Sequence, residues 1–268
     1  MAEPVTPPPA AGRNGPALRA DPPSADAAGG GVTGIIPPPV WARQRRAAKT
    51  ARGFLRVFAS HSAGRQVSGI ILAGGQSRRM DRDKAFLPWG GSTLIEHVIE
   101  TLRPLVDELI VAVKDARRFT HLNARVVEDV VPEAHALGGL YTGLKLAYHD
   151  LCFVCACDAP FLNPRLIRFL VEQADGYNLV IPKTRRGLEP LHAVYAKSAL
   201  CAIEEQLQKH QWDLKALVPE VRTLVVGAEL LHQFDPEELS FFNVNTSGDL
   251  AQVLLIQRER RMRRRNSR

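Results

Sequence analysis

The chain has 268 residues, 45% of them hydrophobic and 24% charged, and carries a net charge of +7 at pH 7. The positive charge lies at the ends, because residues 1–66 hold nine Lys and Arg against three acids and residues 258–268 hold seven Arg against one Glu, which leaves −5 on residues 67–257. A nucleic-acid groove needs a basic folded domain, and residues 67–257 are acidic overall, so nucleic acid is not an expected partner. A membrane span needs about 20 consecutive apolar residues. The sequence contains no such run, so a membrane is not an expected partner either.

Residues 1–66 are predicted to be a disordered extension. Pro, Ala and Gly dominate the first 40 residues, which hold too few large apolar side chains to offset the entropy of ordering. Residues 41–65 are basic, with apolar residues interspersed that would suit a short amphipathic helix. An organelle presequence is disfavoured by the acids in the leader, and a signal-peptide pattern is missing, so we expect a cytoplasmic protein.

Apolar runs alternate with helical patterns through residues 67–257, which we predict to be one domain. The expected strands are 69–73, 109–113, 125–128, 152–156, 179–182, 192–195 and 223–226. The expected helices are 93–103, 139–148, 164–173 and 246–258, with the basic tail of residues 258–268 extending the last helix into solvent. This alternation predicts an α/β fold, in which helices cover both faces of a mostly parallel sheet in three layers.

A glycine-rich loop follows the first predicted strand. Within residues 70–84 a short apolar run breaks at Gly74-Gly75 into a polar, arginine-rich stretch that ends at Lys84. Paired glycines let backbone N–H groups come close to a ligand, and the nearby cations favour an anion, so a polyphosphate is the expected occupant. The pattern is neither the Walker lysine loop nor the dinucleotide fingerprint, since it has no Gly-Lys-Ser/Thr and no third glycine at the required spacing.

The same loop contains Leu72, Ala73, Gly74, Gly75, Ser77, Arg79, Met80, Asp83 and Lys84. In this order they resemble the signature loop of the molybdenum cofactor guanylyltransferases, which have a Rossmann-like nucleotidyltransferase fold. The resemblance implies nucleotide contacts from residues 72–75 and Lys84, and catalytic charges on Arg79 and Lys84. One departure is Asp81, which stands where the family usually has glycine.

Two carboxylates follow predicted strands, at the edge of the sheet where α/β proteins bind ligands. An aspartate after a strand also forms turns, so a purely local role is the alternative for both. Cys157-Asp158-Ala159-Pro160 resembles the family's Cys-Asp-x-Pro motif, which implies that Asp158 is a catalytic and nucleotide-binding residue that binds Mg²⁺. Asp129 matches a family position that contacts the guanine nucleotide.

Glycines 138 and 139 precede a helical pattern, where they would serve either as a helix entry or as a lining of the base pocket. The family has a Gly-Pro-Leu-x-Gly element there, which implies a nucleotide contact from Gly139, although the proline is missing. An asparagine that often follows the family's second strand is replaced near Ala112.

The second half of the domain is expected to bind the acceptor. Residues 189–195, which include Pro190 and His192, resemble the family's strand that faces the pterin substrate, although a lone histidine is more often a core residue. Asn243 and Asn245 alternate on one strand face before the last helix, and nearly reproduce the family's Phe-x-Asn-x-Asn-Thr motif. Both asparagines are implied to contact the acceptor.

Three cysteines, Cys152, Cys155 and Cys157, lie close enough to raise the question of a metal site. A strand sends Cys152 to one face and the other two to the opposite face, so the three do not converge on one ion. We therefore expect reduced core thiols rather than a zinc or iron-sulfur site.

The motifs fall in the family order across about residues 67–257. They imply transfer of GMP from GTP to Mo-molybdopterin with Mg²⁺ as cofactor, and admit transient contacts with cofactor-insertion proteins or molybdoenzymes. The alternatives are a cytidylyltransferase for the same cofactor, a sugar-phosphate nucleotidyltransferase, and a non-catalytic protein that delivers the cofactor. Gly74-Gly75 and the Asn-Val-Asn run favour guanylyl transfer, and Lys84 with Asp158 favour catalysis.

Overall fold

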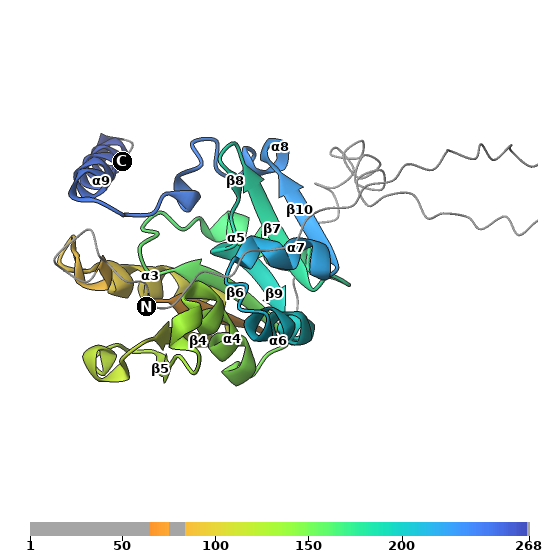
Figure 1. The fold of residues 1–268 in the computed structure, drawn as a ribbon. Coiled ribbons are helices and arrows are strands. Elements are labelled where there is room, and N and C mark those ends of the chain that lie inside the picture. The colour runs from red at the N-terminus through yellow and green to blue at the C-terminus, as the bar shows by residue number, and fades with distance from the viewer. Residues whose placement is uncertain (1–64, 75–83, 267–268) are drawn as a thin grey trace, which may run out of the picture. The chain divides into compact units, whose positions relative to one another are not determined.

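A computed structural model describes residues 65–74 and 84–266 (Figure 1). Gly75, Arg79 and Asp81 lie outside the described residues, as does nearly all of the N-terminal extension. The division into a domain of residues 67–257 and two tails therefore stays a prediction.

The centre of the fold is an eight-stranded sheet with the order β10-β7-β9-β6-β1-β4-β5, in which β8 pairs with β7. Its strands are β1 (Val67–Leu72), β4 (Glu108–Val113), β5 (Arg125–Glu128), β6 (Leu151–Ala156), β7 (Leu179–Thr184), β8 (Gly187–Leu188), β9 (His192–Ala196) and β10 (Thr223–Gly227). The pairs β1–β4, β1–β6, β4–β5 and β7–β10 are parallel, whereas β9 runs antiparallel to β6 and β7. The predicted mostly parallel sheet is confirmed.

Helices cover both faces of the sheet (Figure 1). The α-helices are α3 (Leu94–Leu102), α4 (Ala136–Leu146), α5 (Pro164–Glu172), α6 (Leu200–Gln208), α7 (Leu217–Glu220), α8 (Ala228–Leu231) and α9 (Ser247–Asn266). Apolar side chains of α3, α5 and α8 form one core with one face of the sheet, and those of α4, α6 and α7 form a second core with the other face. The three-layer arrangement is confirmed.

The central strand β1 shows why this layering follows from the sequence. All six of its residues are buried, with Ile71 in the first core and Ile70 and Leu72 in the second. A strand covered on both faces needs such a continuous run of buried residues. Cys152 and Cys155 of β6 are likewise divided between the two cores, as predicted.

Short elements complete the chain. The 3-10 helices are η1 (Lys84–Phe86), η2 (Arg103–Leu105), η3 (Ala116–Phe119), η4 (Pro132–Ala134), η5 (Lys197–Ala199), η6 (Leu214–Ala216) and η7 (Leu239–Phe241), and a small hairpin joins β2 (Pro88–Trp89) to β3 (Ser92–Thr93). Sequence reasoning did not predict this hairpin, β8, α6, α7 or α8. All seven predicted strands are present, but α4 begins three residues before its predicted start at Gly139.

The last helix, α9, continues through the arginine-rich segment to Asn266, so the expected extension of the helix is confirmed that far. Its first turns pack through Leu250 and Val253 on a third, small apolar cluster that contains Leu87, Trp89 and Val244. Every helix within residues 65–74 and 84–266 is too short or too polar to cross a membrane.

Candidate active site

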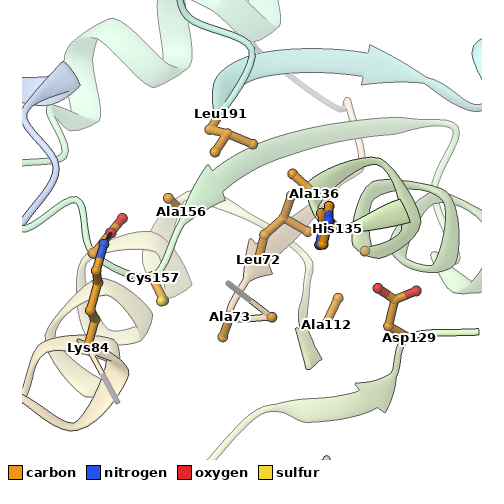
Figure 2. A pocket seen from close by; sticks show the side chains of 13 residues that line it. Leu72, Ala73, Lys84, Ala112, Asp129, His135, Ala136, Ala156, Cys157 and Leu191 are labelled. Carbon is orange, nitrogen blue, oxygen red and sulfur yellow. Dashed lines mark ion pairs between the residues drawn. The ribbon is translucent and has the colours of Figure 1, made fainter. Parts of the chain in front are cut away.

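A pocket lies at the carboxyl ends of β1, β4, β5 and β6, where the chain order of the strands reverses around β1. Its lining residues are Leu72, Ala73, Gly74, Lys84, Ala112, Asp129, His135, Ala136, Gly139, Ala156, Cys157, Asp158 and Leu191. In Figure 2, Lys84 lies on one side of the pocket, Asp129 and His135 lie on the other, and Leu72 and Ala73 lie between them. The sheet thus brings together the predicted nucleotide-binding residues that are described.

Backbone hydrogen bonds fix the floor of this pocket beyond the end of β1. The amide of Ala73 donates to the carbonyl of Ala112 over 2.9 Å, and the amide of Cys157 donates to the carbonyl of Leu72 over 3.1 Å. Because both neighbours of β1 are tied to its last residues, the chain enters the glycine-rich loop from a rigid position. Gly74 lines the pocket at that point.

Lys84 and Asp158 form an ion pair on one side of the pocket. The distance from Lys84 Nζ to Asp158 Oδ2 is 3.5 Å, and the two side chains are 20% and 14% exposed. Lys84 Nζ also donates a hydrogen bond of 2.7 Å to Asn245 Oδ1. Burial raises the pKa of the Asp158 carboxyl, and the positive charge of Lys84 opposes that rise.

Asp158 lies two positions beyond the end of β6, and the C-terminal segment holds its backbone in place. The amide of Val244 donates to the carbonyl of Asp158 over 2.9 Å, while the Val244 side chain is fully buried in the third apolar cluster. The carboxyl group therefore projects into the pocket from a fixed backbone.

Asp129 lies on the opposite side of the pocket and is almost fully buried. Its Oδ1 accepts hydrogen bonds from the amide of Val131 at 2.9 Å and from the hydroxyl of Thr142 at 3.2 Å. Burial raises the pKa of this carboxyl, and the two hydrogen bonds lower it in part. Asp129 thus both closes the loop after β5 and lines the pocket.

The two glycines of α4 meet different steric demands. A Cβ on Gly138 would lie 2.1 Å from the carbonyl oxygen of Val131, so no side chain fits there unless the backbone moves. A Cβ on Gly139 would lie 3.3 Å from Leu72 Cδ2, a tight contact on the pocket wall. Both glycines lie inside the first turns of α4 rather than before the helix.

His135 is a pocket residue that sequence reasoning missed. It is the N-cap residue of α4, with φ 54° and ψ −123°, a conformation that favours glycine, and its side chain is exposed. Ala136, which also lines the pocket, follows it. The sequence signal that was available is a histidine three residues before the Gly138-Gly139 pair.

His192 lies in the core instead of the cleft. It is 3% exposed, and its ring packs edge-on against Phe153 and Phe241, at centroid distances of 5.1 and 4.9 Å. Within the described residues neither ring nitrogen has a hydrogen-bond partner, and burial lowers its pKa to about 4. This burial argues against the expected contact between His192 and the acceptor.

The other expected acceptor residues lie near the surface. Pro190 is partly buried, and its carbonyl accepts the hydroxyl of Tyr195 over 2.9 Å. Asn243 is partly buried and Asn245 is exposed, and both precede α9. Leu191, between Pro190 and His192, reaches the pocket.

The sequence that forms this pocket is similar to a family of known enzymes. Residues 69–222 match a family model described as a MobA-like NTP transferase domain. A probable molybdenum cofactor guanylyltransferase of Pelotomaculum thermopropionicum is 38% identical over 188 residues, which are 70% of this chain and 92% of that protein. The molybdenum cofactor guanylyltransferase of Desulfosudis oleivorans is 33% identical over 186 residues, which are 69% of this chain and 92% of that protein.

The chain belongs to the molybdenum cofactor guanylyltransferase family. The fold agrees with that of a crystal structure of molybdopterin-guanine dinucleotide biosynthesis protein A from Archaeoglobus fulgidus, with a TM-score of 0.64 and 27% identity. The matched region is 72% of this chain and 99% of that one. The chain is thus a nucleotidyltransferase of this family with additional residues outside the matched region.

Membership of the guanylyltransferase family raises the question of a divalent metal. No group of three or more His, Cys, Asp or Glu side chains converges within residues 65–74 and 84–266. Mg²⁺ is commonly held by one or two carboxylates together with substrate phosphates and water, so a single projecting carboxylate is a sufficient protein donor. Asp158, beside the cation of Lys84, fits such a site.

Cys152 and Cys155, two of the three clustered cysteines, are buried on opposite faces of the sheet. Cys152 is buried and its pKa is raised by burial to about 12, and burial raises the pKa of Cys155 as well. Metal ligation requires the thiolate, which such burial disfavours. The two side chains also point into different cores of the molecule.

Proposed function

We propose that this protein transfers GMP from GTP to Mo-molybdopterin, forming the guanine dinucleotide cofactor and pyrophosphate. The family assignment gives the reaction class, since the relatives are curated as molybdenum cofactor guanylyltransferases. The observation that carries the proposal is the pairing of Lys84 with Asp158, 3.5 Å apart at the end of the central strands. A cation and a carboxylate so placed suit a metal-bound triphosphate.

In the proposed reaction, a terminal phosphate oxygen of the pterin cofactor attacks the α-phosphorus of GTP. A new P–O bond forms there, the bond from the α-phosphorus to the bridging oxygen breaks, and pyrophosphate leaves with the bonding electrons. A phosphate acceptor is already anionic near neutral pH, so no general base is needed. The protein contributes by positioning the substrates and by stabilising charge.

Each charged group has a distinct task in this proposal. Lys84 donates to the triphosphate as negative charge develops on the leaving pyrophosphate, and Arg79 is assigned a similar task. Asp158 would hold Mg²⁺, which supplies charge neutralisation at the phosphates when it is bound. The raised pKa of Asp158 favours this assignment, because a bound cation would restore the ionised form that burial disfavours.

We assign the base to the opposite side of the pocket. Both protein donors to Asp129 use Oδ1, which leaves Oδ2 to accept from the N–H groups of guanine. Gly139 provides close backbone approach beside Leu72, and Leu72, Ala73 and Gly74 line the pocket on the side assigned to the phosphates. Gly75, which lies outside the described residues, keeps the phosphate contact that the family resemblance implies. The acceptor side is assigned to Pro190, Asn243 and Asn245.

The nearest alternatives use another nucleotide or acceptor on the same fold. A panel of GTP, CTP, ATP and UTP, each with Mg²⁺ and Mo-molybdopterin, distinguishes them by pyrophosphate release. We expect GTP to be the best substrate by at least tenfold and the product to be the guanine dinucleotide. Preferred turnover of CTP would contradict the proposal, and lack of turnover with every nucleotide would favour a cofactor-delivery protein.

We also propose that the reaction takes place in the cytoplasm and that the tails are dispensable for it. A chain trimmed to residues 67–257 should fold cooperatively and turn over GTP nearly as well as the full chain, because the pocket lies wholly inside that span. Lost folding would make the tails structural. Lost activity with intact folding would instead make them part of the site, or of transient contacts with insertion proteins or molybdoenzymes.

A further inference from the structure

The segment before α9 reaches across the fold to the catalytic lysine. Lys84 and Asn245 are 161 positions apart, yet Lys84 Nζ donates to Asn245 Oδ1 over 2.7 Å. This is shorter than the 3.5 Å that separates the same nitrogen from Asp158 Oδ2. Asn245 is therefore closer to the Lys84 ammonium group than Asp158 is.

Asn245 is itself held by several hydrogen bonds. Its backbone amide donates to Asp249 Oδ2 over 2.9 Å, and the amide of Thr246 donates to the same oxygen over 2.8 Å. Its side-chain Nδ2 donates to the carbonyl of Asn243 over 3.3 Å. Because Nδ2 faces a carbonyl, Oδ1 is the atom that faces the ammonium group, and the orientation of the amide is consistent with both contacts.

Packing anchors the same segment to the wall of the site. Val244 is fully buried in the cluster of Leu87, Trp89 and Leu94, and its backbone amide bonds the carbonyl of Asp158. Leu87 and Leu94 flank the hairpin that follows Lys84 in the chain. The segment therefore contacts both members of the ion pair from one rigid position.

We infer that Asn245 is a positioning residue for Lys84 and so acts on the nucleotide side of the reaction. This inference rests on the proposed function and adds a task to the acceptor contact that the family resemblance implies. A lysine ammonium has three donors, so bonds to Asn245 and Asp158 leave one for a triphosphate oxygen. An amide oxygen holds the lysine without cancelling its charge, whereas a second carboxylate would compete with the phosphates.

The test is nucleotide binding in the absence of acceptor, measured by calorimetry with Mg²⁺ and a GTP analogue that cannot release pyrophosphate. Asn245→Ala should weaken binding about tenfold, on the scale of one hydrogen bond to a charged group. Gln252→Ala, which removes an exposed amide from α9, is the matched control and should bind as the wild type does. A pure acceptor contact predicts unchanged binding for Asn245→Ala, which would overturn the inference.

A double-mutant cycle separates positioning from general loosening of the fold. In a Lys84→Ala background, Asn245→Ala should cause no further loss of affinity, because the interaction it supports is already gone. If Asn245→Ala lowers nucleotide affinity equally in the wild-type and Lys84→Ala backgrounds, the inference is contradicted. It is also contradicted if the melting temperature of Asn245→Ala falls far enough that partial unfolding explains the weaker binding. If the wild type prefers another nucleotide, the proposed function fails, but the same cycle run with that nucleotide still tests Asn245. A wild type that binds no nucleotide overturns both.

Discussion

The loops that follow β5 and β6 each place one aspartate in the pocket, but they use it differently. Asp129 accepts two hydrogen bonds from its own loop and from α4, both at Oδ1. Asp158 is held through its backbone by Val244, and its carboxyl group pairs with Lys84 at 3.5 Å. The Asp129 carboxylate therefore stabilises its own loop through hydrogen bonds. The Asp158 carboxylate pairs with a residue outside its own loop and is available to the pocket.

The two aspartates differ in what offsets the energetic cost of burying their charge. Burial raises the pKa of both carboxyls, so each ionised group carries a cost in the folded state. For Asp129 the internal hydrogen bonds offset part of that cost, whereas for Asp158 the offset comes mainly from Lys84, a group assigned to the substrate. Mutations on the Asp158 side should therefore affect catalysis more than folding, and mutations of Asp129 should affect both.

The largest effect is expected from Lys84→Ala. Its ammonium group is one preorganised donor for the triphosphate, and loss of such a donor typically lowers turnover by about two to three powers of ten. Lys145→Ala, which removes an exposed lysine bonded to Tyr141 on α4, is the control and should leave turnover unchanged. Steady-state pyrophosphate release measures both variants. A loss below threefold for Lys84→Ala would remove this residue from the mechanism.

Asp158→Asn should lower activity about a hundredfold at low Mg²⁺, because a neutral amide is a weaker ligand for a hard cation. Part of the activity should return at high Mg²⁺ or with Mn²⁺, which binds N and O ligands more tightly. The measurement is a titration of each metal at saturating GTP. Full activity at low Mg²⁺ would show that Asp158 only forms a turn.

The same variant should be more stable than the wild type at pH 7. The pKa of Asp158 in the folded protein lies above its ordinary value of 3.8, so the folded protein binds the proton more tightly than the unfolded chain does. The ionised carboxyl therefore costs stability above its folded pKa, and that cost is absent below about pH 3.8. The gain in melting temperature for Asp158→Asn should shrink as pH falls from 7 towards 4, and a gain that grows would contradict this sign.

Much of the fold and part of the site follow from local sequence. The strands could be predicted because buried parallel strands need continuous apolar runs, and Asp158 because a motif places it at the end of one of them. The contact between Lys84 and Asn245 could not, since it joins segments 161 residues apart. His192 was expected to contact the acceptor because its segment resembles the strand that faces the family's pterin substrate, and local sequence does not show which distant residues cover that strand. Phe241, 49 positions further along the chain, covers it.

Substitutions of Asp129 test its assignment as the residue that binds the guanine base. Asp129→Asn keeps an oxygen that accepts from Val131 and Thr142, but it loses the charge that would bind guanine. We expect preference for GTP over ATP to fall about tenfold to a hundredfold, the range for a hydrogen bond to a charged group. Asp129→Ala should in addition lower the free energy of unfolding by about 2 kcal/mol, because it leaves two donors unpaired. Urea denaturation of both variants separates these effects, and equal stabilities would contradict the structural task.

The smallest expected effect is on stability, at His135. Its φ of 54° and ψ of −123° lie in a region that costs a residue with a Cβ about 1–3 kcal/mol, while glycine also gains entropy in the unfolded chain. His135→Gly should therefore stabilise the protein by about 1 kcal/mol, the difference between those terms. His210, with φ 53°, is the matched control because it is exposed and lies outside the pocket. Both substitutions to glycine should raise the melting temperature, but only His135→Gly should weaken binding of GTP, because only this imidazole lines the pocket beside Asp129. A stabilised His135→Gly variant with unchanged GTP affinity would show that the His135 side chain does not contact the nucleotide. Asp129 would then be the side chain of the loop after β5 to which nucleotide binding is assigned.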